Sequence, residues 1–171
     1  ERSLRVLDGG VVVFDGSQGV EPQSETVWRQ ADKYHVPRLA FINKMDKTGG
    51  DFYMSLTSIH ERLGKQAIAI QLPVGQEAEV KAIVDLVLKK AFNFSGKSGE
   101  VITEMPIPAE RQSDILEYRA VLMEKVAEAN DDLTDTFLEN GALTDEQLIL
   151  GLRKATVAGK IYPVVCGSSL Q

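Results

Sequence analysis

The sequence has a single cysteine, Cys166, among its 171 residues, so no disulfide can form within the chain. This cysteine use fits a reducing cytosol, and we expect a cytoplasmic protein. No apolar run approaches the ~18 residues of a membrane span, so we expect no membrane partner. Aromatic residues make up only 6% of the chain, but the 43% hydrophobic share is ordinary for a globular protein with one good core.

The sequence also lacks the phosphate-binding loop of nucleotide hydrolases, Gly-x-x-x-x-Gly-Lys-[Ser/Thr]. The closest match is Gly96, Lys97 and Ser98, but Ala91 stands where the first glycine should be, and the flanking residues predict a hairpin. His35 and His60 form no metal-ligand pair, and no nucleophile has a base at suitable spacing. We therefore expect no catalytic residue and no metal ligand in this chain.

Negative charge is concentrated in one part of the chain. The net charge is −6, and residues 1–66 are neutral, so residues 67–160 hold the excess. Within 110–146 there are 11 acidic residues against three basic ones. Such a surface would repel phosphate backbones and attract a basic protein partner. A plain solvated helix face is the alternative.

Apolar runs separated by helical patterns characterise both ends of the chain. Residues 11–14 and 39–42 read as parallel strands buried on both faces, and residues 161–166 as a third such strand. Because Pro163 cannot donate to a ladder, this third strand should lie at a sheet edge or start late. Helices are predicted at 22–34 and at 52–63, the second ending at Gly64. Strands alternating with helices predict a parallel α/β sheet.

The middle of the chain follows another pattern. Short apolar runs at 68–70, 82–84, 91–94 and 101–103 predict a meander of strands. After Pro108, apolar residues at helical spacing predict a long helix, and residues 144–147 form a capping box that opens another. We therefore predict two units, which are an α/β sheet from 1–66 with 161–171 and an inserted α+β subdomain at 67–160.

The strongest chemical signal is Asn43, Lys44, Met45 and Asp46, directly after the strand predicted at 39–42. Ligands of open α/β sheets bind at the carboxyl ends of the strands. The Asp46 carboxylate can accept from both N1–H and the 2-amino group of guanine, two donors that adenine does not present together. Asn43 offers an amide to the N7/O6 edge, and the Lys44 stem can cover the base face. Taken alone, the match also fits an ordinary strand-end turn.

A second element follows the last predicted strand. Backbone N–H groups of Ser168 and Ser169 can donate to guanine O6, and the small Gly167 lets the backbone approach. This segment alone is a common turn. Combined with the first motif, on neighbouring strands, it predicts a pocket that reads a guanine base.

The sequence resembles the bacterial elongation factor G family over nearly its whole length. The resemblance rests on GVVVFDG at 10–16, GVEPQSETVWRQADKY at 19–34, FINKMD at 41–46, LPVG at 72–75 and PVVCGS at 163–168. It implies an incomplete P-loop GTPase-type parallel sheet with an inserted α+β subdomain. It also implies that Asn43, Lys44, Met45 and Asp46 bind the guanine of GTP or GDP, with Ser168 and Ser169 as the backing loop.

The resemblance further implies a parent protein that hydrolyses GTP, with magnesium, on the ribosome during translocation. The acidic insertion would then contact a basic ribosomal stalk protein. Residues 1–4 begin in a helical pattern without a starting methionine, so we expect an internal piece of that parent, inactive alone because it lacks the phosphate loop and magnesium ligands. An exposed edge at 11–14 would invite self-association. The alternatives are a related ribosomal-protection or release factor, or a non-catalytic ribosome-interaction module.

Overall fold

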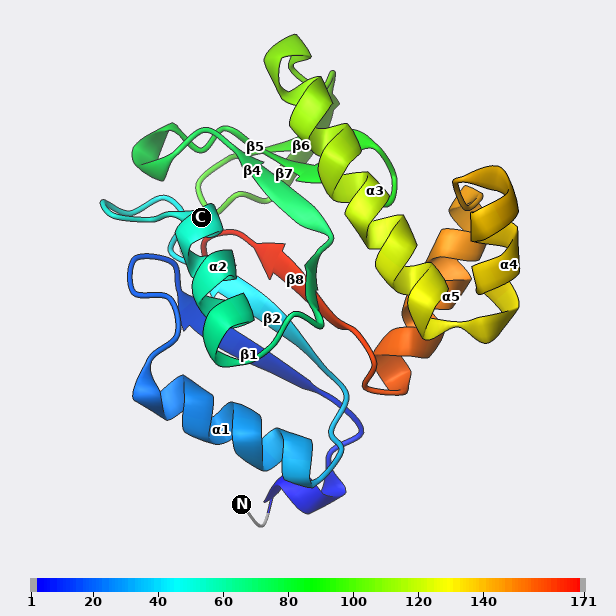
Figure 1. The fold of residues 1–171 in the computed structure, drawn as a ribbon. Coiled ribbons are helices and arrows are strands. Elements are labelled where there is room, and N and C mark those ends of the chain that lie inside the picture. Colours follow the sequence, from blue (N-terminus) through cyan, green and yellow to red (C-terminus); the bar gives the residue numbers. More distant parts are fainter. Residues whose placement is uncertain (1–2, 170–171) are drawn as a thin grey trace.

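The computed structural model describes residues 3–169, which form a parallel sheet and a separate antiparallel sheet (Figure 1). The parallel sheet has the order β1-β2-β8-β3 and consists of β1 (Gly10–Asp15), β2 (Arg38–Asn43), β8 (Tyr162–Cys166) and β3 (Ala67–Ala69). Helices α1 (Pro22–Lys33) and α2 (Phe52–Arg62) alternate with its strands. The predicted α/β class is confirmed.

The insertion combines four antiparallel strands with three helices. The strands are β4 (Gln71–Val74), β5 (Ala82–Asp85), β6 (Lys90–Ser95) and β7 (Val101–Met105), and the helices are α3 (Gln112–Ala129), α4 (Asp131–Asn140) and α5 (Asp145–Val157). Three short 3-10 turns lie at Ser3–Val6, Glu77–Glu79 and Ala109–Arg111. Residues 3 and 4 of the helix expected at 1–4 therefore lie in a 3-10 turn, whereas Glu1 and Arg2 lie outside the described residues.

Only one face of the parallel sheet is fully covered. Phe14, Ala40 and Ile42 face the helices and are at most 1% exposed, with Trp28 of α1 packed against Phe14. On the opposite face Val11 and Val13 are 59% and 55% exposed. The prediction that residues 11–14 are buried on both faces was therefore wrong, because no helix among residues 3–169 covers this side of β1.

The last strand of the sheet is central, which corrects the edge position that Pro163 suggested. β8 pairs with β3 from Tyr162 onward, but its pairing with β2 begins only at Val164. The N–H of Tyr162 donates to Gln66 on the β3 side, so the nitrogen of Pro163 faces the β2 side before that ladder starts. The alternative prediction, that pairing starts late, is confirmed on the β2 side. This late start allows a central strand to contain a proline.

A third correction concerns β3. The sequence placed residues 68–70 in the meander, whereas Ala67–Ala69 pairs in parallel with β8. Such a short run carries no signal for which sheet it joins, and long-range pairing decides. The division of the chain at residues 67 and 161 stays a prediction. Because β3 pairs with the parallel sheet, a first boundary between β3 and β4 would fit the strand pairing better.

The predicted helices form, and their cores follow the predicted stripes. In α3 the side chains of Ile115, Leu122 and Val126 are at most 3% exposed. α5 begins with the expected capping box, in which Thr144 and Gln147 exchange side-chain to backbone bonds. α4 was not predicted. It follows the turn at Asn130 and ends at Gly141, which has a left-handed φ of 68°.

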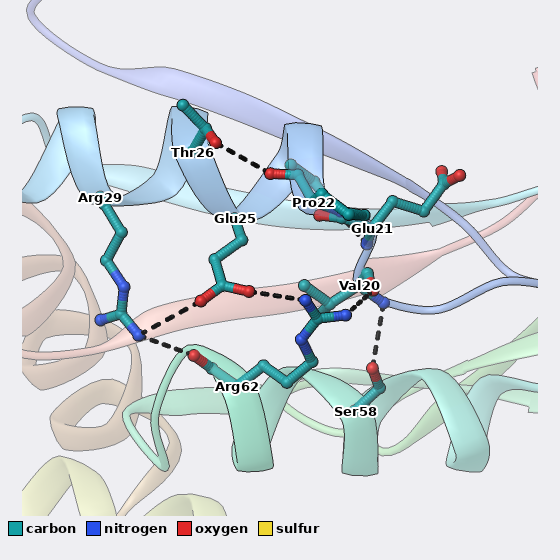
Figure 2. Close-up of polar contacts among 9 residues, drawn as sticks. Val20, Glu21, Pro22, Glu25, Thr26, Arg29, Ser58 and Arg62 are labelled. Atoms are coloured by element: carbon teal, nitrogen blue, oxygen red, sulfur yellow. Dashed lines mark hydrogen bonds and ion pairs between the residues drawn. The ribbon is translucent and has the colours of Figure 1, made fainter.

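A polar clamp joins α1 to α2 (Figure 2). The Arg62 guanidinium donates to the carbonyl of Val20 and pairs with Glu25 at 2.7 Å. In return Arg29 donates to the Arg62 carbonyl at 2.8 Å, and Ser58 accepts from the N–H of Val20. Since α2 starts a few residues after Asp46, the clamp holds the helix that follows the candidate base-reading loop.

Candidate functional site

The predicted site residues lie together at the carboxyl edge of the parallel sheet. The register pairs Asp15 with Asn43 and Ile42 with Cys166, so the loops after β1, β2 and β8 start side by side. Backbone bonds continue beyond the strands, from Gly16 N–H to the Asn43 carbonyl at 2.9 Å and from Gly167 N–H to the Ile42 carbonyl at 3.1 Å. The sheet thus brings together segments that are more than a hundred residues apart in sequence.

Asn43 and Ser169 bind each other. The Asn43 amide donates to the Ser169 hydroxyl at 3.1 Å and accepts from the Ser169 N–H at 2.9 Å. Next to them Met45, which is 1% exposed, donates its N–H to the Gly167 carbonyl at 3.1 Å. The direct base contacts that the sequence analysis assigns to Asn43 and Ser169 would require these bonds to be exchanged for bonds to a ligand. In this structure both residues join the two loops.

Lys44 bends back toward β1. It has a left-handed φ of 61°, and its ammonium pairs with Asp15 at 2.5 Å. The hydroxyl and N–H of Ser17 hold the other oxygen of this carboxylate at 2.6 and 2.9 Å. The hydrogen bonds from Lys44 and then Ser17 lower the pKa of Asp15 to about 2, and Asp15 raises the pKa of Lys44. Sequence reasoning missed Asp15, although its place at the end of the neighbouring strand could have revealed it.

Asp46 supplies an unsatisfied acceptor. Its Oδ1 atom is buried and has no hydrogen-bond partner among the described residues. Asp46 lines a cavity of about 250 Å³ together with Phe41, Met45, Gly167 and Ser168 of the same sheet edge. Because a buried unpaired carboxylate oxygen costs free energy, a ligand donor at this position would be stabilising. The N–H groups of a guanine edge fit this requirement.

Gly50 keeps the Asp46 loop tight. A Cβ atom on Gly50 would lie 2.9 Å from the carbonyl oxygens of Lys44 and Lys47 and 3.0 Å from that of Met45. Real side chains almost never approach backbone this closely, so the loop closes only around a glycine. The shape of the loop that contains Asp46 therefore depends on Gly50, four residues further along the chain.

The whole chain, residues 1–171, matches the model of a protein family described as the elongation factor Tu GTP binding domain. The chain belongs to this family. A solved structure of a protein from Thermus thermophilus is similar, with a TM-score of 0.85 and 25% identity over 98% of this chain and 24% of that one. The chain thus spans about a quarter of the length of that protein.

The description of this family names GTP as its ligand. A GTP-binding protein needs a loop that holds the phosphates, and segment 96–99 is the closest match to such a loop in the sequence. The segment 96–99 forms the hairpin loop between β6 and β7, as predicted. Its amides are taken by Glu100, whose carboxylate accepts from the N–H groups of Lys97 at 3.3 Å and Ser98 at 2.8 Å. The N–H groups of this loop that could bind a phosphate are therefore bonded to the Glu100 carboxylate.

The remaining candidate groups have structural partners. The Nε2 atom of His60 lies 2.6 Å from the Ala67 carbonyl, and burial raises the pKa of the Cys166 thiol to about 12. Within residues 3–169 no three His, Cys, Asp or Glu side chains gather as metal ligands. Nor does this stretch contain a helix long and apolar enough to cross a membrane.

Two of the three basic residues in the acidic stretch of the insertion have side chains that are largely buried. Arg119 has a side chain only 6% exposed, donates to the carbonyls of Leu86 and Val87, and pairs with Asp145 at 2.8 Å. Arg111 is 18% exposed at its side chain and binds inward as well. Each of these two cations pairs with a more exposed carboxylate, Arg119 with Asp145 (60% exposed) and Arg111 with Asp114 (39% exposed).

Proposed function

We propose that this chain is the guanine-reading part of an elongation factor G-type protein, which hydrolyses GTP on the ribosome in the cytoplasm to drive translocation. The observation that carries the proposal is the buried, unpaired Oδ1 of Asp46 beside the backing loop at 167–169. Family membership supports the ligand class. The resemblance at 19–34 favours elongation factor G over the same-class alternative, a ribosomal-protection or release factor.

Each predicted site residue has a role in this proposal. Asp46 accepts from N1–H and the 2-amino group of guanine, and the backing loop with Ser168 donates to O6. The Lys44 stem covers one face of the base while its ammonium stays on Asp15. Asn43 and Met45 hold the backing loop at the right distance through Ser169 and Gly167.

Phosphates and magnesium are held elsewhere in the parent protein under this proposal. GTP hydrolysis needs a phosphate cradle and metal ligands. The loop at 96–99 binds Glu100, and within residues 3–169 no three His, Cys, Asp or Glu side chains gather as metal ligands. We therefore expect the isolated chain to bind guanine nucleotides weakly and to hydrolyse none. A fluorescent GDP titration at micromolar concentration should show no saturation.

Nuclear magnetic resonance tests the base-reading role directly, because it detects millimolar binding. Titration of the nitrogen-15-labelled chain with GMP should shift the amides of the Asp46 loop and of Ser168, whereas AMP should shift neither. In Asp46→Asn, an amide replaces the acceptor facing N1–H, and GMP affinity should fall at least about tenfold. Equal shifts with AMP, or an unchanged affinity in the variant, would refute the proposal.

The acidic surface supports a second proposal, contact with a basic ribosomal stalk protein. Glu117, Glu124 and Glu128 are exposed on α3 at spacings of seven and four residues, which place them on one helix face. Charge complementarity would steer a basic partner to this face. In a pull-down at low salt, reversing these three charges should abolish capture of the purified stalk protein. If the unaltered chain captures no stalk protein, the proposed contact is wrong, and so is the alternative that the chain is a ribosome-interaction module.

A further inference from the structure

The cavity that contains Asp46 has a second wall, which comes from the insertion. Lys81, Ala82 and Ile83 at the start of β5 and Phe94 of β6 line it opposite the residues of the parallel sheet. In Figure 1, β8 runs toward the antiparallel sheet, so the carboxyl edge of one sheet faces the other. The candidate base site therefore lies between the two units of the chain.

Phe94 is the unusual member of this wall. Phe94 is 47% exposed although it lines a cavity, and the half-buried Phe41 lines the same cavity. An aromatic ring that lines a cavity but remains partly in water gains apolar contact when a flat ligand fills the space. Every nucleobase has such a flat face, and bases stack readily on aromatic side chains.

The size of the cavity suits a base. Its volume of about 250 Å³ far exceeds the ~30 Å³ share of one water molecule in the liquid. It lies just below the ~300–1,000 Å³ range of sites that enclose drug-sized ligands. The cavity is therefore large enough for a purine ring system.

We propose that the insertion supplies the second wall of the guanine site and that Phe94 packs on the base read by Asp46. This inference rests on the proposed function of the site and adds a specific contact to it. The insertion is then an affinity element for the nucleotide as well as a surface for partners. A ligand in the cavity touches both sheets and stabilises their present arrangement.

Substitution of Phe94 tests the contact. Phe94→Ala should weaken GMP binding roughly tenfold, the effect expected from removing one stacking side chain. Phe94→Tyr keeps the aromatic face and should retain affinity, whereas Phe94→Leu keeps only apolar surface and should lose most of it. Val101→Ala is a matched control, because Val101 is 50% exposed on the neighbouring strand and does not line the cavity. The leucine variant decides the matter if the alanine variant fails to fold.

Amide shifts in the same GMP titration locate the ligand. GMP should shift the amides of residues 81–83 and 94 together with those of the Asp46 loop. Shifts in the Asp46 loop alone, or unchanged affinity in both Phe94→Leu and Phe94→Ala, would overturn this inference and leave the proposed function standing. Absence of GMP shifts in the Asp46 loop would overturn the proposed function, and the inference with it.

Discussion

Asn43 and Ser169, which are 126 positions apart, each donate one hydrogen bond to the other at the carboxyl edge of the parallel sheet. The Asn43 side chain thereby extends the hydrogen bonding between β2 and β8 beyond the last paired residues of the two strands. The two loops that read the base in our proposal are thus fixed to each other before any ligand binds. Such preorganisation lowers the entropic cost of binding.

Asn43→Ala should loosen the backing loop. The variant loses both bonds, and we expect a loss of about 1–2 kcal/mol in the free energy of unfolding. In hydrogen exchange the Ser169 amide should lose its protection while the β8 amides keep theirs. Asn43→Asp keeps an acceptor for the Ser169 N–H and should preserve that protection. If the Ser169 amide exchanges equally fast in the unaltered chain, the bond is not persistent.

The ion pair between Asp15 and Lys44 predicts an acid-dependent stability. The folded pKa of Asp15 is about 2, below its ordinary value of 3.8, so the carboxylate stabilises the fold above pH ~4. This contribution should be lost as the pH falls from ~4 to ~2, because protonation breaks the bonds to Lys44 and Ser17. Urea unfolding should therefore show Asp15→Asn less stable than the unaltered chain at pH 6 and equal to it near pH 2. Asp8→Asn, at an exposed acid before β1, should show no such convergence.

Arg38 predicts a large stability effect away from the site. Arg38 is 3% exposed, and its guanidinium lies 4.8 Å from the Trp28 ring centroid and 4.6 Å from that of Tyr162 and pairs with Asp32 at 2.9 Å. Removing it leaves Asp32 and two backbone carbonyls without their donor. We expect Arg38→Ala to lower the free energy of unfolding by about 3 kcal/mol. Arg29→Ala, which removes an exposed ion pair with Glu25 and an exposed hydrogen bond to the Arg62 carbonyl, should cost under ~1 kcal/mol in the same urea titration.

The open edge of β1 predicts self-association of the chain. β1 pairs on one side only, with β2, and presents Val11 and Val13 at 59% and 55% exposure. Light scattering after size-exclusion chromatography should show a dimer whose fraction grows with concentration. Val13→Lys should shift the chain toward monomer, whereas Val157→Lys on α5, at a position 68% exposed, should not. A monomer at all concentrations would show that the edge is protected.

Much of the architecture could be predicted from local patterns. The capping box at Thr144, the stripe of Ile115, Leu122 and Val126, and the hairpin at 96–99 formed as expected, because each depends on residues close in sequence. The segment proposed to read the base follows β2, as predicted, because a change from apolar to polar residues marks the end of the strand.

The errors concern relations between distant segments. Nothing near residues 67–69 indicates that they pair with β8, and nothing near Pro163 indicates that its nitrogen faces the side where pairing starts late. Likewise, a count of charges could not show that Arg111 and Arg119 point inward. Each of these outcomes depends on which element lies across from the residue.

The sequence by itself determined the chemistry of the candidate site, because Asp46, Lys44 and the small residues at 167–169 carry their donors and acceptors wherever they lie. The tertiary structure alone decided how these groups are used. It joined Asn43 to Ser169 by two hydrogen bonds, paired Lys44 with Asp15, and left Oδ1 of Asp46 buried without a hydrogen-bond partner. The physical reason is that hydrogen bonding and desolvation depend on distance and burial, which long-range packing sets.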